Sequence, residues 1–348
     1  MFRFAVLSAI TFAVAYLLYV FPVLALISLF QGGPIFGPLA LPATALVFVL
    51  LRLYLATSTT NRLLKAFVYY GMGIGFLAGM TLSVLLLVRA LGTFDGPVLG
   101  MVALVTIAGL TLFAIRNANG LVIRNISLSS ERIDRPLRLA FISDVHIGSN
   151  PPSHLQKICE QLQGEEFDAL LIGGDLFDSS DFTLEDISAL RLIQQDIYFV
   201  TGNHEGYVRG YESQLARFSE LGIHVLDNSV VDLNGINLIG VCDEQPVAER
   251  ARVVDALHQP GKFNLAMVHQ PSIWQQTNSK VDLMLCGHTH RGQIFPFNFL
   301  VRLQFRYVYG LFTDAASTLY VSSGSGCWGP RMRLGSRNEI VMIDLTPA

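Results

Sequence analysis

The first 118 residues of this chain contain only seven charged side chains, and this scarcity is the strongest constraint on its fold. Six of the seven are basic and one is acidic, so the segment has a net charge of +5, whereas the whole chain carries −3. Only 15% of all residues are charged, against about 25% in ordinary soluble domains. We therefore expect a membrane domain over residues 1–118 and a water-soluble domain over residues 119–348, which is large enough for a core of its own.

Four apolar stretches in the first half have the length of a transmembrane helix, about 20 residues. The predicted spans are Phe4 to Phe30, Ile35 to Leu55, Leu63 to Val88 and Pro97 to Ile115. Lysine and arginine gather in alternate loops, between the second and third stretches and after the fourth. By the positive-inside rule, this pattern places both the N-terminus and the whole second half in the cytoplasm.

The predicted spans indicate an anchor or a lipid-facing platform, because they contain no Asp, Glu or His that could line an ion or proton path. The third stretch carries Gly71, Gly75 and Gly79 at four-residue spacing, a stripe of small residues that lets helices approach closely. Packing against the other three spans is one interpretation of this stripe. A homodimer formed through the same glycines is the alternative.

The second half alternates short apolar runs with polar helical stretches, which is typical of βα units. The expected strands are Leu137–Ser143, Ala169–Gly173, Ile197–Thr201, Asn237–Val241, Leu265–Val268 and Leu283–Cys286. The expected helices are Ser153–Leu162, Leu184–Gln194 and Tyr211–Leu221. The pattern predicts an α/β domain whose functional residues lie where loops leave the carboxyl ends of strands.

Five short blocks of metal-binding or proton-transferring residues follow such apolar runs. They read Ser143-Asp144-Val145-His146, Gly174-Asp175, Gly202-Asn203-His204-Glu205, Val268-His269-Gln270-Pro271 and Gly287-His288-Thr289-His290. Carboxylate, amide oxygen and imidazole together suit Mn, Fe, Co or Zn. Asp175, at a tight Gly-Asp turn, is suited to bridge two ions with its two oxygens. Two metals about 3.5–4 Å apart can clamp the attacking and leaving oxygens of a phosphoryl centre.

These blocks resemble the motifs of the calcineurin-like metallophosphoesterase family, from roughly Leu137 to the end of the chain. The resemblance implies a four-layer α-β-β-α sandwich with two divalent metal ions; manganese is expected, and iron, zinc or cobalt are alternatives. It implies Asp144, His146, Asp175 and His290 as ligands of one ion, and Asp175, Asn203, His269 and His288 as ligands of the other. It gives His204 the role of general acid, while a metal-bridging hydroxide attacks phosphorus.

Two further carboxylates are expected to orient these groups without binding metal. Asp178 would orient a ligand, as carboxylates behind metal-bound histidines often do. Glu205 stands where many members of the family have Asp, and any contact it makes would be with His204.

Two features indicate a lipid-linked substrate. The membrane spans would hold the site near the inner leaflet, and the segment Gly292 to Phe312 interleaves aromatic and aliphatic residues with Arg302 and Arg306. Such a segment suits the headgroup boundary of a bilayer, although a packed core hairpin is the alternative. The tail from Gly324 to Arg333 resembles membrane-associated bacterial phosphodiesterases, including enzymes that cleave the pyrophosphate of UDP-diacylglucosamine.

The sequence therefore predicts a membrane-anchored phosphohydrolase of a bacterial inner membrane, with its catalytic domain in the cytoplasm. It would cleave a phosphodiester or pyrophosphate bond in a phosphorylated lipid or nucleotide-lipid. One alternative is a phosphodiesterase acting on a soluble nucleotide-type substrate, with the spans as a tether. Another is a non-catalytic scaffold that binds phosphate. No nucleic-acid partner is expected, because the chain has no concentrated basic stripe.

Overall fold

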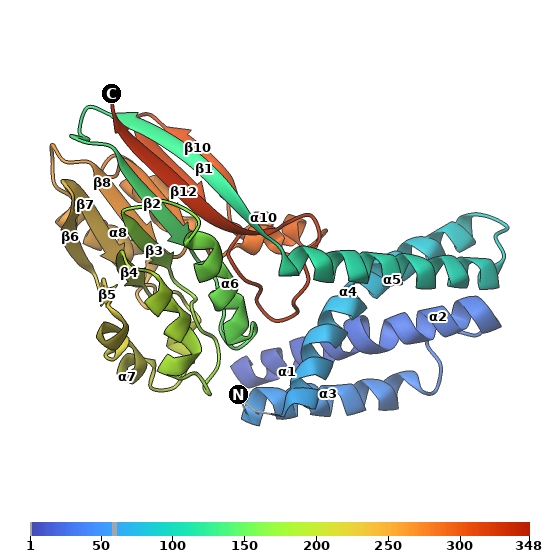
Figure 1. Ribbon diagram of the computed structural model, residues 1–348. Helices are drawn as coiled ribbons and strands as arrows, with labels where there is room; N and C mark the ends of the chain where they lie inside the picture. Colours follow the sequence, from blue (N-terminus) through green and yellow to red (C-terminus); the bar gives the residue numbers. More distant parts are fainter. Residues whose placement is uncertain (1, 58–60) are drawn as a thin grey trace. The chain divides into compact units, whose positions relative to one another are not determined.

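The computed structural model describes residues 2–57 and 61–348. Contacts divide the chain into two compact units, which we call the helical unit and the sandwich unit. The helical unit comprises Met1–Arg116 with Gly329–Met332, and the sandwich unit comprises Asn117–Trp328 with Arg333–Ala348. Each unit is described by itself (Figure 1).

The helical unit contains three helices that are long and apolar enough to cross a membrane, Ala5–Gln31, Leu63–Leu91 and Gly96–Asn119. The first joins α1 (Phe2–Val14), a π-helical segment η1 (Ala15–Val20) and α2 (Phe21–Gln31); the others correspond to α4 (Arg62–Leu91) and α5 (Gly96–Asn119). These three match the first, third and fourth predicted spans.

The second predicted span is shorter than expected. It forms α3 (Ala40–Thr57), whose apolar part is Ala40–Leu55. The sequence prediction began at Ile35, but Gly37 and Pro38 precede the helix, and a proline disfavours helical geometry in the residue before it. Four membrane-length helices are therefore not found among the described residues; three are.

The glycine stripe of α4 packs against the first helix of the same chain. A Cβ atom on Gly75 would overlap the carbonyl oxygen of Leu18, and one on Gly71 would overlap the ring of Tyr19. The hydroxyl of Tyr19 donates a hydrogen bond to the carbonyl oxygen of Val68 over 2.6 Å, which fixes the contact. The stripe thus lets two helices of one chain approach closely. A homodimer through the same glycines stays a prediction.

The sandwich unit is built on two six-stranded sheets, with strand orders β1-β12-β2-β3-β4-β5 and β10-β11-β9-β8-β7-β6. The first sheet consists of β1 (Leu121–Ser130), β2 (Leu137–Ile142), β3 (Ala169–Gly173), β4 (Asp196–Val200), β5 (Ile223–Val225) and β12 (Asn338–Pro347). The second consists of β6 (Ser229–Leu233), β7 (Ile236–Val241), β8 (Asn264–Val268), β9 (Leu283–Cys286), β10 (Gly310–Asp314) and β11 (Ser317–Val321). Both sheets are mixed, because β12 runs antiparallel to β2 and β6 antiparallel to β7.

Three apolar clusters show that the sandwich unit has four layers. Phe141 and Leu171 of the first sheet meet Leu238 and Leu265 of the second in a shared core. The outer face of the first sheet is covered by α6 (Pro152–Leu162), the 3-10 helices η2 (Leu184–Leu192) and η4 (Phe218–Leu221), and the short α7 (Tyr211–Leu215). The outer face of the second is covered by α8 (Val247–Leu257), η5 (Pro271–Ile273) and α9 (Trp274–Thr277). The expected α-β-β-α order is present.

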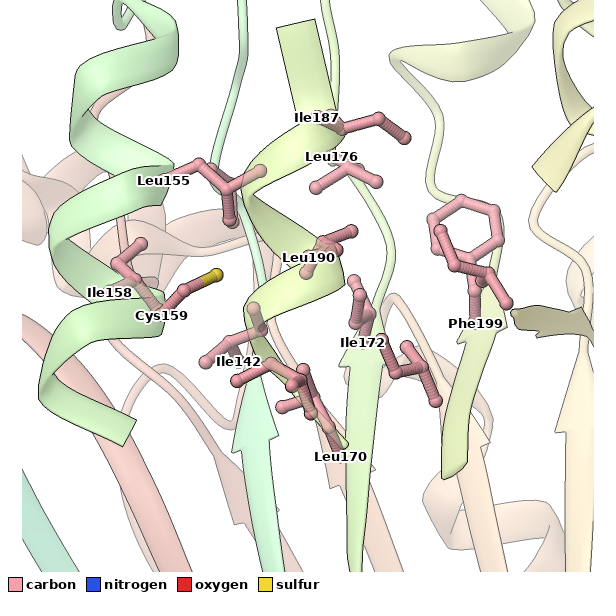
Figure 2. Packing of buried hydrophobic residues seen from close by; sticks show 14 of the residues in the cluster. Ile142, Leu155, Ile158, Cys159, Leu170, Ile172, Leu176, Ile187, Leu190 and Phe199 are labelled. Atoms are coloured by element: carbon pink, nitrogen blue, oxygen red, sulfur yellow. The ribbon is translucent and has the colours of Figure 1, made fainter. Parts of the chain in front are cut away.

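Helix α6 shows how sequence periodicity produces one of these layers. Its buried apolar side chains are Leu155, Ile158, Cys159 and Leu162, the i, i+3, i+4, i+7 spacing of a helix face turned to a core. They lie over Ile142 and other side chains from the strands beneath (Figure 2). Each fully buried aliphatic side chain contributes roughly 1.5–3 kcal/mol relative to exposure. This packing holds β2 and β3 rigid where the functional loops begin.

The six predicted strands all form, as β2, β3, β4, β7, β8 and β9. The helix predicted over Tyr211–Leu221 was wrong in part, because it is divided into α7 and η4, and the one predicted over Leu184–Gln194 is a 3-10 helix. The prediction missed the pairing of β1 with β12, which runs parallel in register from Leu121↔Asn338 to Ser130↔Pro347. Nothing local in either segment reveals a partner some 200 residues away.

Candidate metal centre

The five predicted blocks meet at the carboxyl ends of five strands, three from one sheet and two from the other. Asp144 and His146 follow β2, Asp175 follows β3, Asn203 and His204 follow β4, His269 follows β8, and His288 and His290 follow β9. Because β2, β3 and β4 are parallel to one another, as are β8 and β9, their ends lie along common sheet edges. The two edges face each other across the sandwich, and the side chains converge.

Most of these residues occupy a backbone conformation that sequence reasoning did not predict. Asp144, His146, Asp175, His288 and His290 have φ angles of 54°, 51°, 52°, 71° and 48°. Non-glycine residues in this left-handed region cost roughly 1–2 kcal/mol each. Strain of this kind persists only where surrounding structure fixes it, and it is concentrated at functional sites.

A first group of ligand atoms comes from Asp144, His146 and His290. Nε2 of His146 lies 3.1 Å from Nε2 of His290, which in turn lies 3.5 Å from Oδ1 of Asp144. All three residues are buried. Two imidazole nitrogens and a carboxylate oxygen this close form the donor set expected around a divalent ion.

A second group comes from Asp175, His269 and His288. Nε2 of His269 lies 3.0 Å from Oδ2 of Asp175 and 3.3 Å from Nδ1 of His288. The side-chain oxygen of Asn203 is buried and has no hydrogen-bond partner among the described residues. A buried acceptor without a partner costs about 1–3 kcal/mol, and a cation would satisfy it. Asn203 is the predicted fourth ligand at this position.

Asp175 lies between the two groups. Its Oδ2 lies 3.0 Å from Nε2 of His269 and 3.7 Å from Nε2 of His146. Its Oδ1 accepts a hydrogen bond from the backbone amide of His204 over 2.8 Å. Oδ1 is therefore engaged by the loop after β4, and Oδ2 lies near both groups.

Charges in the cluster favour metal binding, since metal ligands must be deprotonated. Burial and the nearby His269 lower the pKa of His288 to about 3, and burial with His146 lowers the pKa of His290 well below its usual value. Burial alone would raise the pKa of Asp175, but His269 and His146 hold it below its ordinary range. Burial would lower the pKa values of His146 and His269, but Asp178 and Asp175 raise them above the usual value. The same carboxylates would attract divalent cations, which would displace protons from these two rings.

Neighbouring groups orient two of the histidines. Nδ1 of His269 lies 2.8 Å from the carbonyl oxygen of Gly173, so a proton on Nδ1 leaves Nε2 free to bind. Nδ1 of His146 lies 3.3 Å from Oδ2 of Asp178, and Oδ1 of Asp178 accepts a hydrogen bond from the backbone amide of Ser149. Asp178 thus lies where the predicted orienting carboxylate would be.

His204 lies beside the first group, with its ring centroid 4.7 Å from that of His146. Burial lowers its pKa to about 4, although Asp175 acts in the opposite direction. His146, Asp178 and His204 form a third set of atoms that could hold an ion. This set includes His204 and Asp178, two of the three residues that the sequence analysis placed near the ions without binding them, so a metal-binding experiment must separate the two assignments.

Glu205 contacts the backbone, whereas the sequence suggested a contact with His204. It is fully buried, and its two oxygens accept hydrogen bonds from four backbone amides, those of Asp175, Leu176, Phe177 and Gly202, over 2.6–3.1 Å. Burial and the charge of Asp175 raise the pKa of Glu205 to about 8. One carboxylate therefore ties together the loops that follow β3 and β4.

Sequence reasoning missed two neighbours of the ligands. The hydroxyl of Ser143 donates to Oδ2 of Asp144 over 2.7 Å. Arg333 is fully buried, donates to the carbonyl oxygen of His290 over 3.1 Å, and has a second nitrogen 3.3 Å from Nδ1 of that histidine. The position of Ser143 beside Asp144 was a usable signal. Arg333, 43 residues beyond His290 in the chain, offered none.

Comparison with known proteins agrees with this geometry. Residues 137–292 match the family described as calcineurin-like phosphoesterase. An uncharacterized metallophosphoesterase of Helicobacter pylori is 34% identical over 240 residues, covering 65% of this chain and 64% of the relative. A transmembrane protein with metallophosphoesterase domain from Danio rerio is 30% identical over 292 residues, covering 74% of this chain and 64% of the relative. This chain thus spans just under two thirds of these relatives' lengths.

The match covers β2 through β9, and every predicted ligand lies inside it. These residues therefore form a calcineurin-like metallophosphoesterase domain.

Proposed function

We propose that this chain is a membrane-anchored two-metal phosphohydrolase that cleaves a phosphodiester or pyrophosphate bond in a lipid-linked substrate. The observation that carries the proposal is the position of Asp175, whose Oδ2 lies near both ligand groups. Asp144, His146 and His290 would hold one ion, Asn203, His269 and His288 the other, and Asp175 both. Bound divalent ions supply an activated water and neutralise phosphate oxygens.

His204 is the proton donor in this proposal. Its pKa of about 4 in the metal-free protein leaves the imidazole neutral at pH 7, with one N–H that can donate to a phosphate oxygen. A bound phosphate places negative charge beside the ring, which favours the protonated form and raises its pKa. The protonated ring can then transfer its proton to the leaving oxygen.

We also propose that the chain crosses a bacterial inner membrane four times, with the sandwich unit in the cytoplasm. The charge distribution supports four spans, since lysine and arginine cluster on alternate loops. The name of the Danio rerio relative, a transmembrane protein, is consistent with a membrane location. If only the three longer helices cross, the N-terminus and the sandwich unit lie on opposite sides. Reporter fusions at both ends decide between three and four spans.

Metal-dependent cleavage of bis-(p-nitrophenyl) phosphate tests the proposed chemistry. We expect manganese-stimulated hydrolysis by the full chain, its loss in Asp175→Ala and a reduced rate in His204→Ala. His224→Ala is the matched control, because His224 is an exposed histidine with 58% of its side chain accessible. Full activity in either of the first two variants would refute the mechanism. Repeated turnover by the unaltered chain would exclude the phosphate-binding scaffold.

A soluble nucleotide-type substrate is the second candidate. The observation in its favour is a cavity of about 460 Å³ that begins at Thr201, directly before the Gly202-Asn203 turn. Tyr211, Asn228 and Gln245 supply uncharged hydrogen-bonding groups to its lining, and Glu212, Asp227 and Glu244 supply carboxylates. A nucleoside has matching donors and acceptors, whereas an acyl chain does not. Comparing cyclic nucleotides with phospholipids as substrates of the same reconstituted protein discriminates between the two candidates.

A further inference from the structure

An exposed apolar surface lies on the segment that follows the last metal-ligand block. It consists of Phe295, Phe297, Phe299, Leu300 and Leu303, whose exposed fractions are 49%, 45%, 56%, 56% and 85%. The last three belong to the helix α10 (Asn298–Gln304). We call these five residues the α10 patch. Contiguous apolar surface of this kind commonly marks an interaction site.

The α10 patch is rigidly connected to the metal centre. The hydroxyl of Thr289, between the two histidines of its block, donates to the carbonyl oxygen of Val308 and so closes the segment at its base. Phe305, directly after α10, has its ring centroid 5.1 Å from that of the ligand His288. The surface therefore borders the groups that would bind substrate.

A second connection runs through Trp328. The side chain of Gln293 makes two hydrogen bonds of 3.0 Å with the backbone of Trp328, one as donor and one as acceptor. The Trp328 ring is 49% exposed, and its centroid lies 5.6 Å from that of His204. Trp328 thus places a further exposed apolar side chain beside the proposed proton donor.

Charge around the α10 patch favours an anionic surface. From Leu283 to Thr313 the sequence contains no Asp or Glu, whereas Arg302 and Arg306 are exposed beside the patch. Aromatic and aliphatic side chains next to arginines are the composition of segments that lie in the headgroup region of a bilayer. Basic residues near an anionic leaflet contribute about 1 kcal/mol each.

We propose that the α10 patch docks onto the surface of the bilayer that anchors the chain, in a leaflet containing anionic lipid. Continuity of the chain supports this occupant, because the membrane-length helix α5 ends at Asn119 and β1 begins at Leu121. A tether this short keeps the local concentration of bilayer surface high, so weak contacts suffice. In combination with the proposed function, docking would place the metal centre at the lipid headgroups.

Fluorescence quenching in the full chain tests docking directly. The four native cysteines are buried, so Leu303→Cys accepts an environment-sensitive dye selectively. In vesicles of phosphatidylcholine and phosphatidylglycerol, we expect its emission to shift to the blue, to be quenched by spin-labelled lipid, and to be protected from iodide. Ser213→Cys, an exposed position on α7 far from α10 within the sandwich unit, is the matched control and should show the reverse (Figure 1).

Two further substitutions test whether quenching by lipid depends on the α10 patch. Adding Phe299→Glu and Leu300→Glu to the labelled chain should abolish quenching by lipid. Equal iodide access at the two labelled positions would overturn the proposal. Protection of the Leu303→Cys dye from both quenchers would also overturn it, because a protein would then cover the surface. None of these readouts involves hydrolysis, so docking and the proposed activity can fail independently. Cleavage of bis-(p-nitrophenyl) phosphate by the same samples reports on the proposed activity.

Discussion

The carboxylate of Glu205 accepts a hydrogen bond from the backbone amide of Asp175 over 3.0 Å, although the two residues are 30 positions apart. The same carboxylate accepts hydrogen bonds from three more backbone amides, so the loops that follow β3 and β4 share one buried acceptor. Asp175, the proposed bridging ligand, is therefore positioned in part by Glu205, which is not among the proposed metal ligands.

Glu205→Gln should weaken metal binding and lower stability together. The amide nitrogen of glutamine would face backbone N–H donors, and each buried donor left without a partner costs about 1–3 kcal/mol. Calorimetric metal titration and thermal unfolding measure the two effects. Glu212→Gln, an exposed substitution on α7, is the control. Unchanged metal affinity in Glu205→Gln would show that the hydrogen bonds accepted by Glu205 from the two loops do not influence metal binding.

His204→Gln should impair different substrates unequally. A proton donor matters most when the leaving oxygen is basic, and general acid catalysis contributes about 10²–10⁴-fold. We expect a loss of that size for an alkyl phosphodiester and a smaller loss for bis-(p-nitrophenyl) phosphate, whose leaving group departs readily without a proton. The ratio of kcat values for the two substrates is the measurement. Equal losses would assign His204 to substrate binding alone.

Removing metal should destabilise the sandwich unit. A ligand at 100 times its dissociation constant stabilises a protein by about 2.7 kcal/mol, so chelation should lower the unfolding temperature measurably. The stabilisation should persist in His204→Ala and vanish in Asp175→Ala. Loss of one bound ion in His204→Ala would instead favour the set formed by His146, Asp178 and His204.

Gly75→Leu should destabilise the helical unit. A side chain at this position meets the backbone of Leu18, which cannot move aside as a flexible side chain would. Overpacking of this kind typically costs about 1–3 kcal/mol. Gly109→Leu in α5 is the matched control, since a Cβ there has nothing within 4 Å. Thermal unfolding in detergent compares the two, and equal melting temperatures would contradict the close contact.

The strands that carry the ligands were predictable because their signals are local. Leu139 to Ile142 and Leu283 to Cys286 are short apolar runs, and Asp144 and His288 follow them within two residues. Both the strands and the position of the site can therefore be predicted from adjacent residues. The ligand assignment depended on the residue types and their order. It did not depend on the geometry, which the sequence does not contain.

The remaining features depend on contacts between distant segments. The hydrogen bond that engages Oδ1 of Asp175 comes from the amide of His204, on another loop. The backbone clamp of Glu205 and the buried Arg333 likewise need partners far along the chain. The late start of α3 is the exception, because it could have been predicted from local residues. Gly37 and Pro38 precede the helix in the sequence, but the apolar composition of the whole stretch favoured a start at Ile35.

The place of β12 between β1 and β2 determines when the first sheet can be completed during synthesis. The apolar helices and the five blocks of predicted ligands are synthesised before residues 338–347. Until those residues are synthesised, β1 lacks the strand beside which it lies in the sheet, and β2 has one unpaired edge. The helices can thus enter the bilayer first, while the sheet beneath the metal-binding loops waits for the last strand. Substitutions in β12 should therefore reduce the yield of folded protein more than their distance from the metal centre suggests.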